Sequence, residues 1–141
     1  MSWIVWALLS AFFAGVTAVL AKAGVANLDP NLAIAVRTSV VLVLVWSLAF
    51  ATAKPSAVLE IPRQAWLPLV LSGLATGASW LCYFHALKLG EVSRVAALDK
   101  LGVVFAILLA VVFLKERLGW QQAAGALLIV TGALVLAWPR H

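Results

Sequence analysis

The sequence predicts an all-α integral membrane protein, built as a bundle of five transmembrane helices. Hydrophobic residues make up 65% of its 141 residues, and the mean hydropathy is +1.11, whereas a soluble domain is only about 45–50% apolar. Five apolar segments approach the length of about 20 residues that a helix needs to cross a bilayer. The turns between them are too short for an extramembrane domain, so residues 1–141 are expected to form one transmembrane domain.

Each expected span is bounded by charges, glycine or proline. Asp29 followed by Pro30 marks a helix start, with Asp29 as the N-cap. Pro68 is expected in the first turn of its helix, where a missing N–H is tolerated. The fourth segment is read as one apolar helix. The five expected spans cover residues 3–21, 31–52, 65–87, 92–114 and 120–138.

The basic residues are spread over loops and helix ends. Ten Lys and Arg against five Asp and Glu give a net charge of +5, which membrane topology and lipid head groups explain without a nucleic-acid partner. The positive-inside rule sets orientation by asymmetry between the two sides. Here the tally is four against five, which favours insertion in both orientations and an antiparallel homodimer. The alternative is one orientation set by a weak bias. The residues counted are Lys54, Arg63, Lys115 and Arg117 on one side, and Lys22, Arg37, Lys88, Arg94 and Arg140 on the other.

Four charged residues fall within the expected spans, and three of them, Arg37, Asp99 and Lys100, lie away from the span ends. Such a residue costs about 2.5–3.5 kcal/mol on insertion scales, so it normally faces a partner or a water-filled cavity. At about 1.5 Å per residue, Arg37 and Trp80 lie about 10 Å below one membrane face, and Asp99 lies about 12 Å below it. We therefore expect Arg37, Asp99 and Lys100 to form one network, walled by Trp80 and Tyr83.

This network has more than one interpretation. An Arg37–Asp99 ion pair could simply fix helix packing. Two bases with one acid would suit an anionic or zwitterionic solute, although Lys100 could instead be neutral at this depth. Asp99 is also a candidate for proton coupling. His85 is a further candidate site residue, with a partly solvated helix-end role as the alternative. Trp80 and Tyr83 could be ordinary core aromatics.

The sequence gives no indication of an enzyme. It contains no Ser/His/Asp arrangement, paired carboxylates, metal-ligand cluster or phosphate-binding loop. The single Cys82 excludes an internal disulfide framework. We therefore expect no cofactor and no metal.

Two stretches carry a resemblance to a known family. An apolar helix running from Val103 ends at Glu116, a short basic turn follows, and the next helix carries Gly125 and Gly132 seven residues apart. This pattern resembles the closing half of an EamA domain in the drug/metabolite transporter superfamily. The segments 80–87 and 99–101 look like the single-domain, five-span bacterial branch. Many EamA domains carry proline at the position of Val103, so a proline-bent helix is not assumed here.

The resemblance implies a bacterial inner-membrane carrier of small metabolites or drugs. Larger members of the family hold two such domains in inverted orientation, so one domain implies half of an inverted-repeat transporter that works by alternating access. A homodimer would rebuild the pair, with Gly125 and Gly132 at the contact between copies; intrachain packing is the alternative. Hydrophobic-cation export as in the small multidrug resistance branch is not expected, because residues 3–21 contain no acid.

A second class of function stays open beside transport. The chain could be a non-transporting membrane subunit, or a lipid-handling, flippase-like component. The expected partners are thus a small solute, membrane lipid and a second copy of the chain.

Overall fold

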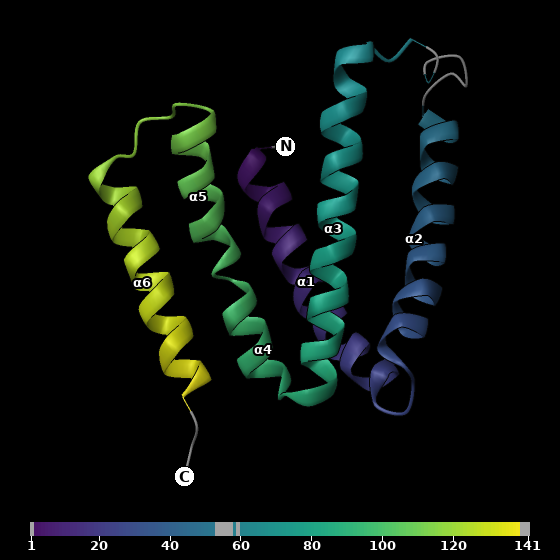
Figure 1. Cartoon of the computed structure of the whole chain (residues 1–141), viewed down its shortest axis with the longest axis horizontal. Coiled ribbons are helices and arrows are strands. Elements are labelled where there is room, and N and C mark those ends of the chain that lie inside the picture. The colour runs from purple at the N-terminus through teal and green to yellow at the C-terminus, as the bar shows by residue number, and fades with distance from the viewer. Residues whose placement is uncertain (1, 53–57, 59, 139–141) are drawn as a thin grey trace. The chain divides into compact units, whose positions relative to one another are not determined.

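The computed structural model describes residues 2–52, 58 and 60–138, and these residues form helices with no strand (Figure 1). This confirms the predicted all-α class. Five helical segments are long and apolar enough to cross a membrane, and α4 and α5 together make the fourth of them. The helices are α1 (Trp3–Val25), α2 (Pro30–Thr52), α3 (Arg63–Leu89), α4 (Val92–Asp99), α5 (Gly102–Phe113) and α6 (Trp120–Ala137).

Two helix starts were predicted from local sequence signals, and the structure confirms the prediction at Asp29 but not the one at Pro68. Asp29 caps α2 as predicted, since its Oδ1 accepts hydrogen bonds from the N–H of Asn31 at 2.9 Å and of Leu32 at 3.3 Å. The placement of Pro68 in a first turn is wrong. Helix α3 begins earlier than expected, at Arg63, so Pro68 falls in the second turn and removes one helical hydrogen bond.

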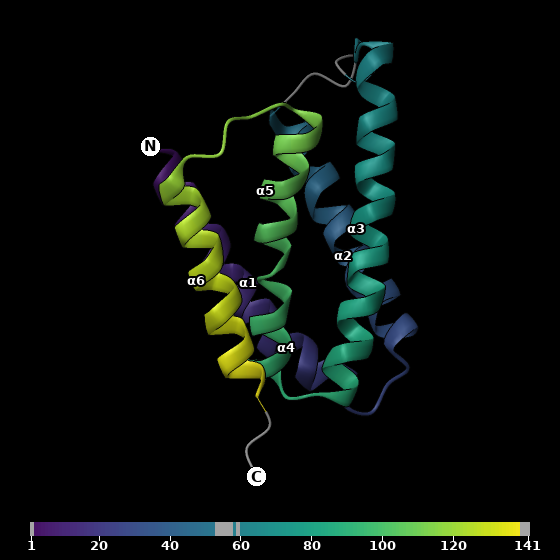
Figure 2. The same cartoon turned by 60° about the vertical axis from the view of Figure 1, so that its left-hand side comes forward.

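The described chain divides into two compact units. The first combines Met1–Lys22 with Leu89–His141. Within it, α4 and α5 pack against α6, which runs antiparallel to them (Figures 1 and 2). The small residues Ala97 of α4 and Ala133 of α6 are buried, and small side chains let helices approach closely. Lys22 Nζ donates a 2.9 Å hydrogen bond to the carbonyl of Gly90.

The second unit, Ala23–Lys88, holds the end of α1, all of α2 and most of α3. Its buried side chains include Ile34 of α2 and Phe84 and Leu87 of α3. Lys88 Nζ donates a 2.7 Å hydrogen bond to the carbonyl of Leu28. This bond ties the end of α3 to the turn that precedes α2.

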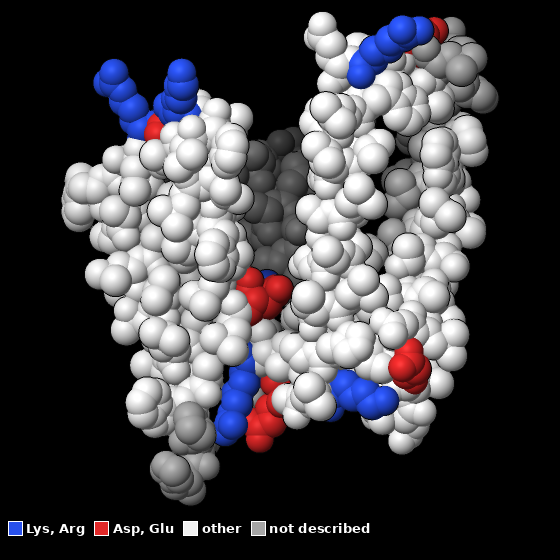
Figure 3. Space-filling view, viewed as in Figure 1, with Lys and Arg blue, Asp and Glu red and all other residues white. Residues whose placement is uncertain are grey.

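Most charged side chains lie at the helix ends of each unit, and the band between them is mostly uncharged but contains an acidic patch (Figure 3). Most large apolar side chains on the helices are exposed, with Leu67 and Leu128 as examples at 68% and 73%. Such a surface is stable only against lipid or another apolar surface. The chain is therefore a multi-pass integral membrane protein. Lys54 and Arg140 lie outside the described residues, and dual topology stays a prediction.

The fourth span is one apolar segment but two helices, so the expectation of an uninterrupted helix was wrong. Helix α4 ends at Asp99 and α5 begins at Gly102. At the junction, the N–H of Lys100 bonds the carbonyl of Ala97 at 3.2 Å, and the N–H of Leu101 bonds that of Leu98 at 3.0 Å. Both bonds reach three residues back instead of four, which is the tighter 3₁₀ geometry often seen at functional hinges.

Candidate solute-recognition site

A cation over two aromatic rings lies between α2 and α3. The guanidinium carbon of half-buried Arg37 is 4.3 Å from the centre of the Trp80 ring and 5.5 Å from that of the Phe84 ring. Trp80 and Phe84 are four residues apart on α3, which places them on the same helix face. Phe84 is only 2% exposed, so it anchors this aromatic platform in the core of the second unit.

Arg37 makes no ion pair with the described carboxylates of its own unit, Asp29 and Glu60. Its contacts with the rings are worth about 0.5–2 kcal/mol. That is less than the cost of about 2.5–3.5 kcal/mol for placing a charge in a membrane helix. The rings engage the guanidinium through its face and not through hydrogen bonds, so its N–H donors are available to an anion.

Two other predicted site residues lie on the same helix. Tyr83 is half-buried, next to Phe84 in sequence. His85 is exposed, and its Nδ1 lies 2.8 Å from the carbonyl oxygen of Leu81, one turn earlier. One ring nitrogen of His85 is thus engaged with its own helix, and only the other is available to a ligand or proton.

Asp99 and Lys100 lie in the first unit, at the junction of α4 and α5. Lys100 Nζ is 3.5 Å from Asp99 Oδ2, and the side chains are 58% and 43% exposed. An ion pair this open holds the fold together only weakly. Arg37 belongs to the other unit, and the expected network of these two residues with Arg37 stays a prediction.

The two glycines predicted at a dimer contact lie on open parts of α6. A Cβ added at Gly125 or Gly132 would meet no other side chain or element of its own unit within 4 Å. Close packing within that unit therefore does not explain these glycines.

Two features of the site were missing from the sequence-based prediction. Phe84 was not among the predicted site residues, although its spacing from Trp80 was a usable signal. The interruption at Lys100 and Leu101 had no proline to mark it, and Gly102 was the one available signal. Both features adjoin residues that the sequence had already singled out.

Comparison with known proteins identifies the family. The EamA-like transporter family matches residues 1–138. The chain belongs to this family. EamA-like proteins are transporters, so membership establishes a membrane transporter whose substrate is a small solute, and it favours a carrier over an enzyme.

Similar EamA-like proteins come from bacteria. An "Uncharacterized transporter in cobO 3'region" from Sinorhizobium sp is 51% identical over 136 residues, which is 96% of each chain. A "Probable terminal-alkyne amino-acid exporter" from Streptantibioticus cattleyicolor is 38% identical over 64% of this chain and 31% of its own length. An "Uncharacterized transporter YxxF" from Bacillus subtilis is 29% identical over 93% of this chain and 41% of its own length. No solved structure matches.

Proposed function

We propose that this chain carries small anionic or zwitterionic solutes, recognises their anionic group through Arg37, and works as an antiparallel homodimer by alternating access. The observation that supports this most is the Arg37 guanidinium over the Trp80 ring without a carboxylate partner in its own unit. A guanidinium presents a planar fork of donors that matches a carboxylate or phosphate. The ring of Trp80 holds that fork in one plane and leaves its edge free for the solute.

The pair at the helix junction supplies the complementary charge. In this proposal, the Asp99 carboxylate binds the amine of a zwitterionic solute. When the solute is absent, Lys100 neutralises the charge of Asp99. Interrupted helices border the substrate site in many secondary transporters. An amino acid has both charges, and the Streptantibioticus relative carries "amino-acid exporter" in its name.

The homodimer rests on three separate observations. The near-equal charge tally gives one chain little preference between orientations. The match with the Bacillus relative covers 93% of this chain but only 41% of the relative. The relative is therefore long enough for a second such region. Gly125 and Gly132 are open within their unit, as a contact with a second copy would require.

A solute panel tests the proposal directly. Thermal unfolding in detergent is measured with glycine, leucine, succinate, choline and tetraphenylphosphonium, on wild type, Arg37→Gln and Arg63→Gln. Leucine, glycine or succinate should raise the unfolding temperature of the wild type, since a ligand at about 100 times its Kd stabilises by about 2.7 kcal/mol. The effect should vanish in Arg37→Gln and persist in Arg63→Gln, whose residue lies at the start of α3.

Other outcomes of the panel would contradict the proposal. Stabilisation only by choline and tetraphenylphosphonium would indicate that the substrates are cations and not anions or zwitterions. No stabilisation by any solute, together with no uptake into proteoliposomes, would favour the non-transporting subunit.

A further inference from the structure

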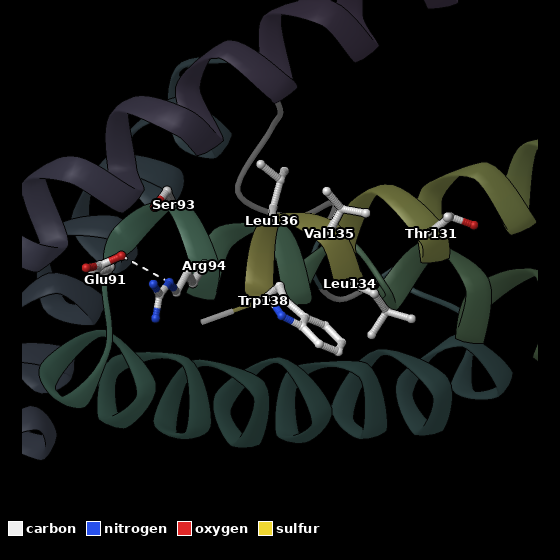
Figure 4. Close-up of a pocket in the computed structure, with 8 residues that line it drawn as sticks. All are labelled: Glu91, Ser93, Arg94, Thr131, Leu134, Val135, Leu136 and Trp138. Atoms are coloured by element: carbon white, nitrogen blue, oxygen red, sulfur yellow. Dashed lines mark ion pairs between the residues drawn. The ribbon is translucent and has the colours of Figure 1, made fainter. Parts of the chain in front are cut away.

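The first unit contains a groove with a volume of about 900 Å³ on one flank of α4 and α6. Its lining includes none of the residues assigned to the proposed carrier site. Figure 4 shows its lining: charged and polar side chains come from the start of α4, and mostly apolar ones from α6. The lining residues are Glu91, Ser93, Arg94, Thr131, Leu134, Val135, Leu136 and Trp138.

An ion pair stands at the mouth of this groove. Arg94 Nε lies 3.1 Å from Glu91 Oε2, and the side chains are 32% and 69% exposed. One N–H of the guanidinium is used in this contact, and the remaining donors are free to bind a phosphate. The second oxygen of Glu91 remains available to a cation. The mouth therefore offers a positive and a negative group side by side.

Along α6, the lining of the groove changes from a residue typical of the lipid head-group level to apolar residues. Trp138 follows the last helical residue, in a position typical of the lipid head-group level. Its ring and the side chain of Leu134 extend to the same side of α6 as the Arg94 guanidinium (Figure 4). Thr131 lies one turn further in, and its hydroxyl already donates to the carbonyl of Leu127 at 2.7 Å. Beyond the mouth, the lining thus suits a hydrocarbon chain.

We propose that this groove binds a phospholipid with an amine in its head group. The lipid phosphate lies on Arg94, its ammonium group lies on Glu91, and an acyl chain runs along Leu134 and Val135. Charge complementarity selects this occupant, because a zwitterionic head group matches both charges of the mouth. An anionic lipid matches Arg94 only and is repelled by Glu91.

Native mass spectrometry tests the proposal on the full-length protein. The probes are phosphatidylethanolamine and phosphatidylglycerol with identical chains, added to protein stripped of lipid. The wild type should retain phosphatidylethanolamine preferentially. Arg94→Gln should lower this retention about tenfold, since hydrogen bonds to charged groups are the strong ones. Glu91→Gln should remove the preference and bring the ratio of the two lipids close to one. Arg117→Gln, altered beyond α5 at the other end of the unit, is the matched control.

A third variant addresses the acyl chain and guards against misfolding. Val135 is 70% exposed, so Val135→Trp fills the groove without removing a buried contact or a charge. It should keep the wild-type circular dichroism and unfolding temperature while losing phosphatidylethanolamine. Equal retention of both lipids by the wild type, or unchanged retention in Arg94→Gln and Val135→Trp, would overturn the proposal. So would a disulfide between two copies that forms efficiently from Val135→Cys, because a second copy would then occupy the groove.

Discussion

The guanidinium of Arg37 lies 4.3 Å from the centre of the Trp80 ring. The contact joins α2 to α3 and places a positive charge within membrane-spanning segments. The described carboxylates of the same unit make no ion pair with it, which is the basis for proposing a role in solute binding and not in packing alone.

Replacing Trp80 tests the structural part of this contact. Trp80→Leu should destabilise the protein by about 0.5–2 kcal/mol, the range for a cation–π contact, which is a fall of a few degrees in unfolding temperature for a chain of this size. Trp80→Phe should lose less, because a ring remains under the guanidinium. Trp66→Leu, near the start of α3, is the control. An equal loss in both leucine variants would assign the effect to general apolar burial.

Asp99→Asn separates function from stability. Both side chains of the Asp99–Lys100 pair are exposed. Loss of the pair should therefore change the free energy of unfolding by less than about 0.5 kcal/mol. Uptake of the preferred zwitterionic solute into proteoliposomes should nevertheless fall at least about tenfold. If Asp99→Asn unfolds the protein in detergent, the charges at the helix junction are structural.

The interruption of the fourth span predicts an unusual effect of glycine replacement. A Cβ at Gly102 would meet no atom within 4 Å in its own unit, and alanine favours a helix by about 0.5–1 kcal/mol over glycine. Gly102→Ala should therefore raise the unfolding temperature and, by stiffening the junction, slow transport. Gly15→Ala in α1 should give a similar stability gain at an unchanged rate. A faster or equal rate in Gly102→Ala would exclude a hinge at this place.

A bulky residue on the open face of α6 tests the dimer. Gly132→Leu should fold as the wild type does, since no neighbour within the unit lies near the new side chain. The fraction of cross-linked dimer in proteoliposomes should fall several-fold. Gly15→Leu, at another open glycine, is the comparison. A lower unfolding temperature with an unchanged dimer fraction would instead favour intrachain packing of this face.

Much of the fold could be predicted because the bilayer imposes simple rules. Apolar length identified the membrane-crossing segments, and Asp29 before Pro30 located the start of α2 correctly. Counting residues from the helix ends also gave Arg37 and Trp80 similar depths, and the structure places them in contact. Depth along a helix follows from its constant rise, so it can be read from sequence.

Features that depend on small backbone changes or on packing were harder to predict. At Lys100 and Leu101 the backbone hydrogen bonds reach three residues back instead of four, and no residue type marks such a change reliably. The spacing of Phe84 from Trp80 places both rings on one helix face, but it does not tell which face meets Arg37. The groove beside Arg94 depends on the angle between α4 and α6 and left no motif.

Uptake by Arg37 variants is the most direct test of the central claim. Proteoliposomes containing wild type, Arg37→Gln, Arg37→Lys or Arg63→Gln are compared for uptake of the amino acid or carboxylate that stabilises the wild type most. Arg37→Gln should lower uptake at least about tenfold, and Arg37→Lys should recover part of it, because lysine keeps the charge but loses the planar fork. Arg63→Gln should match the wild type. Equal uptake by Arg37→Gln and wild type would contradict solute recognition at Arg37.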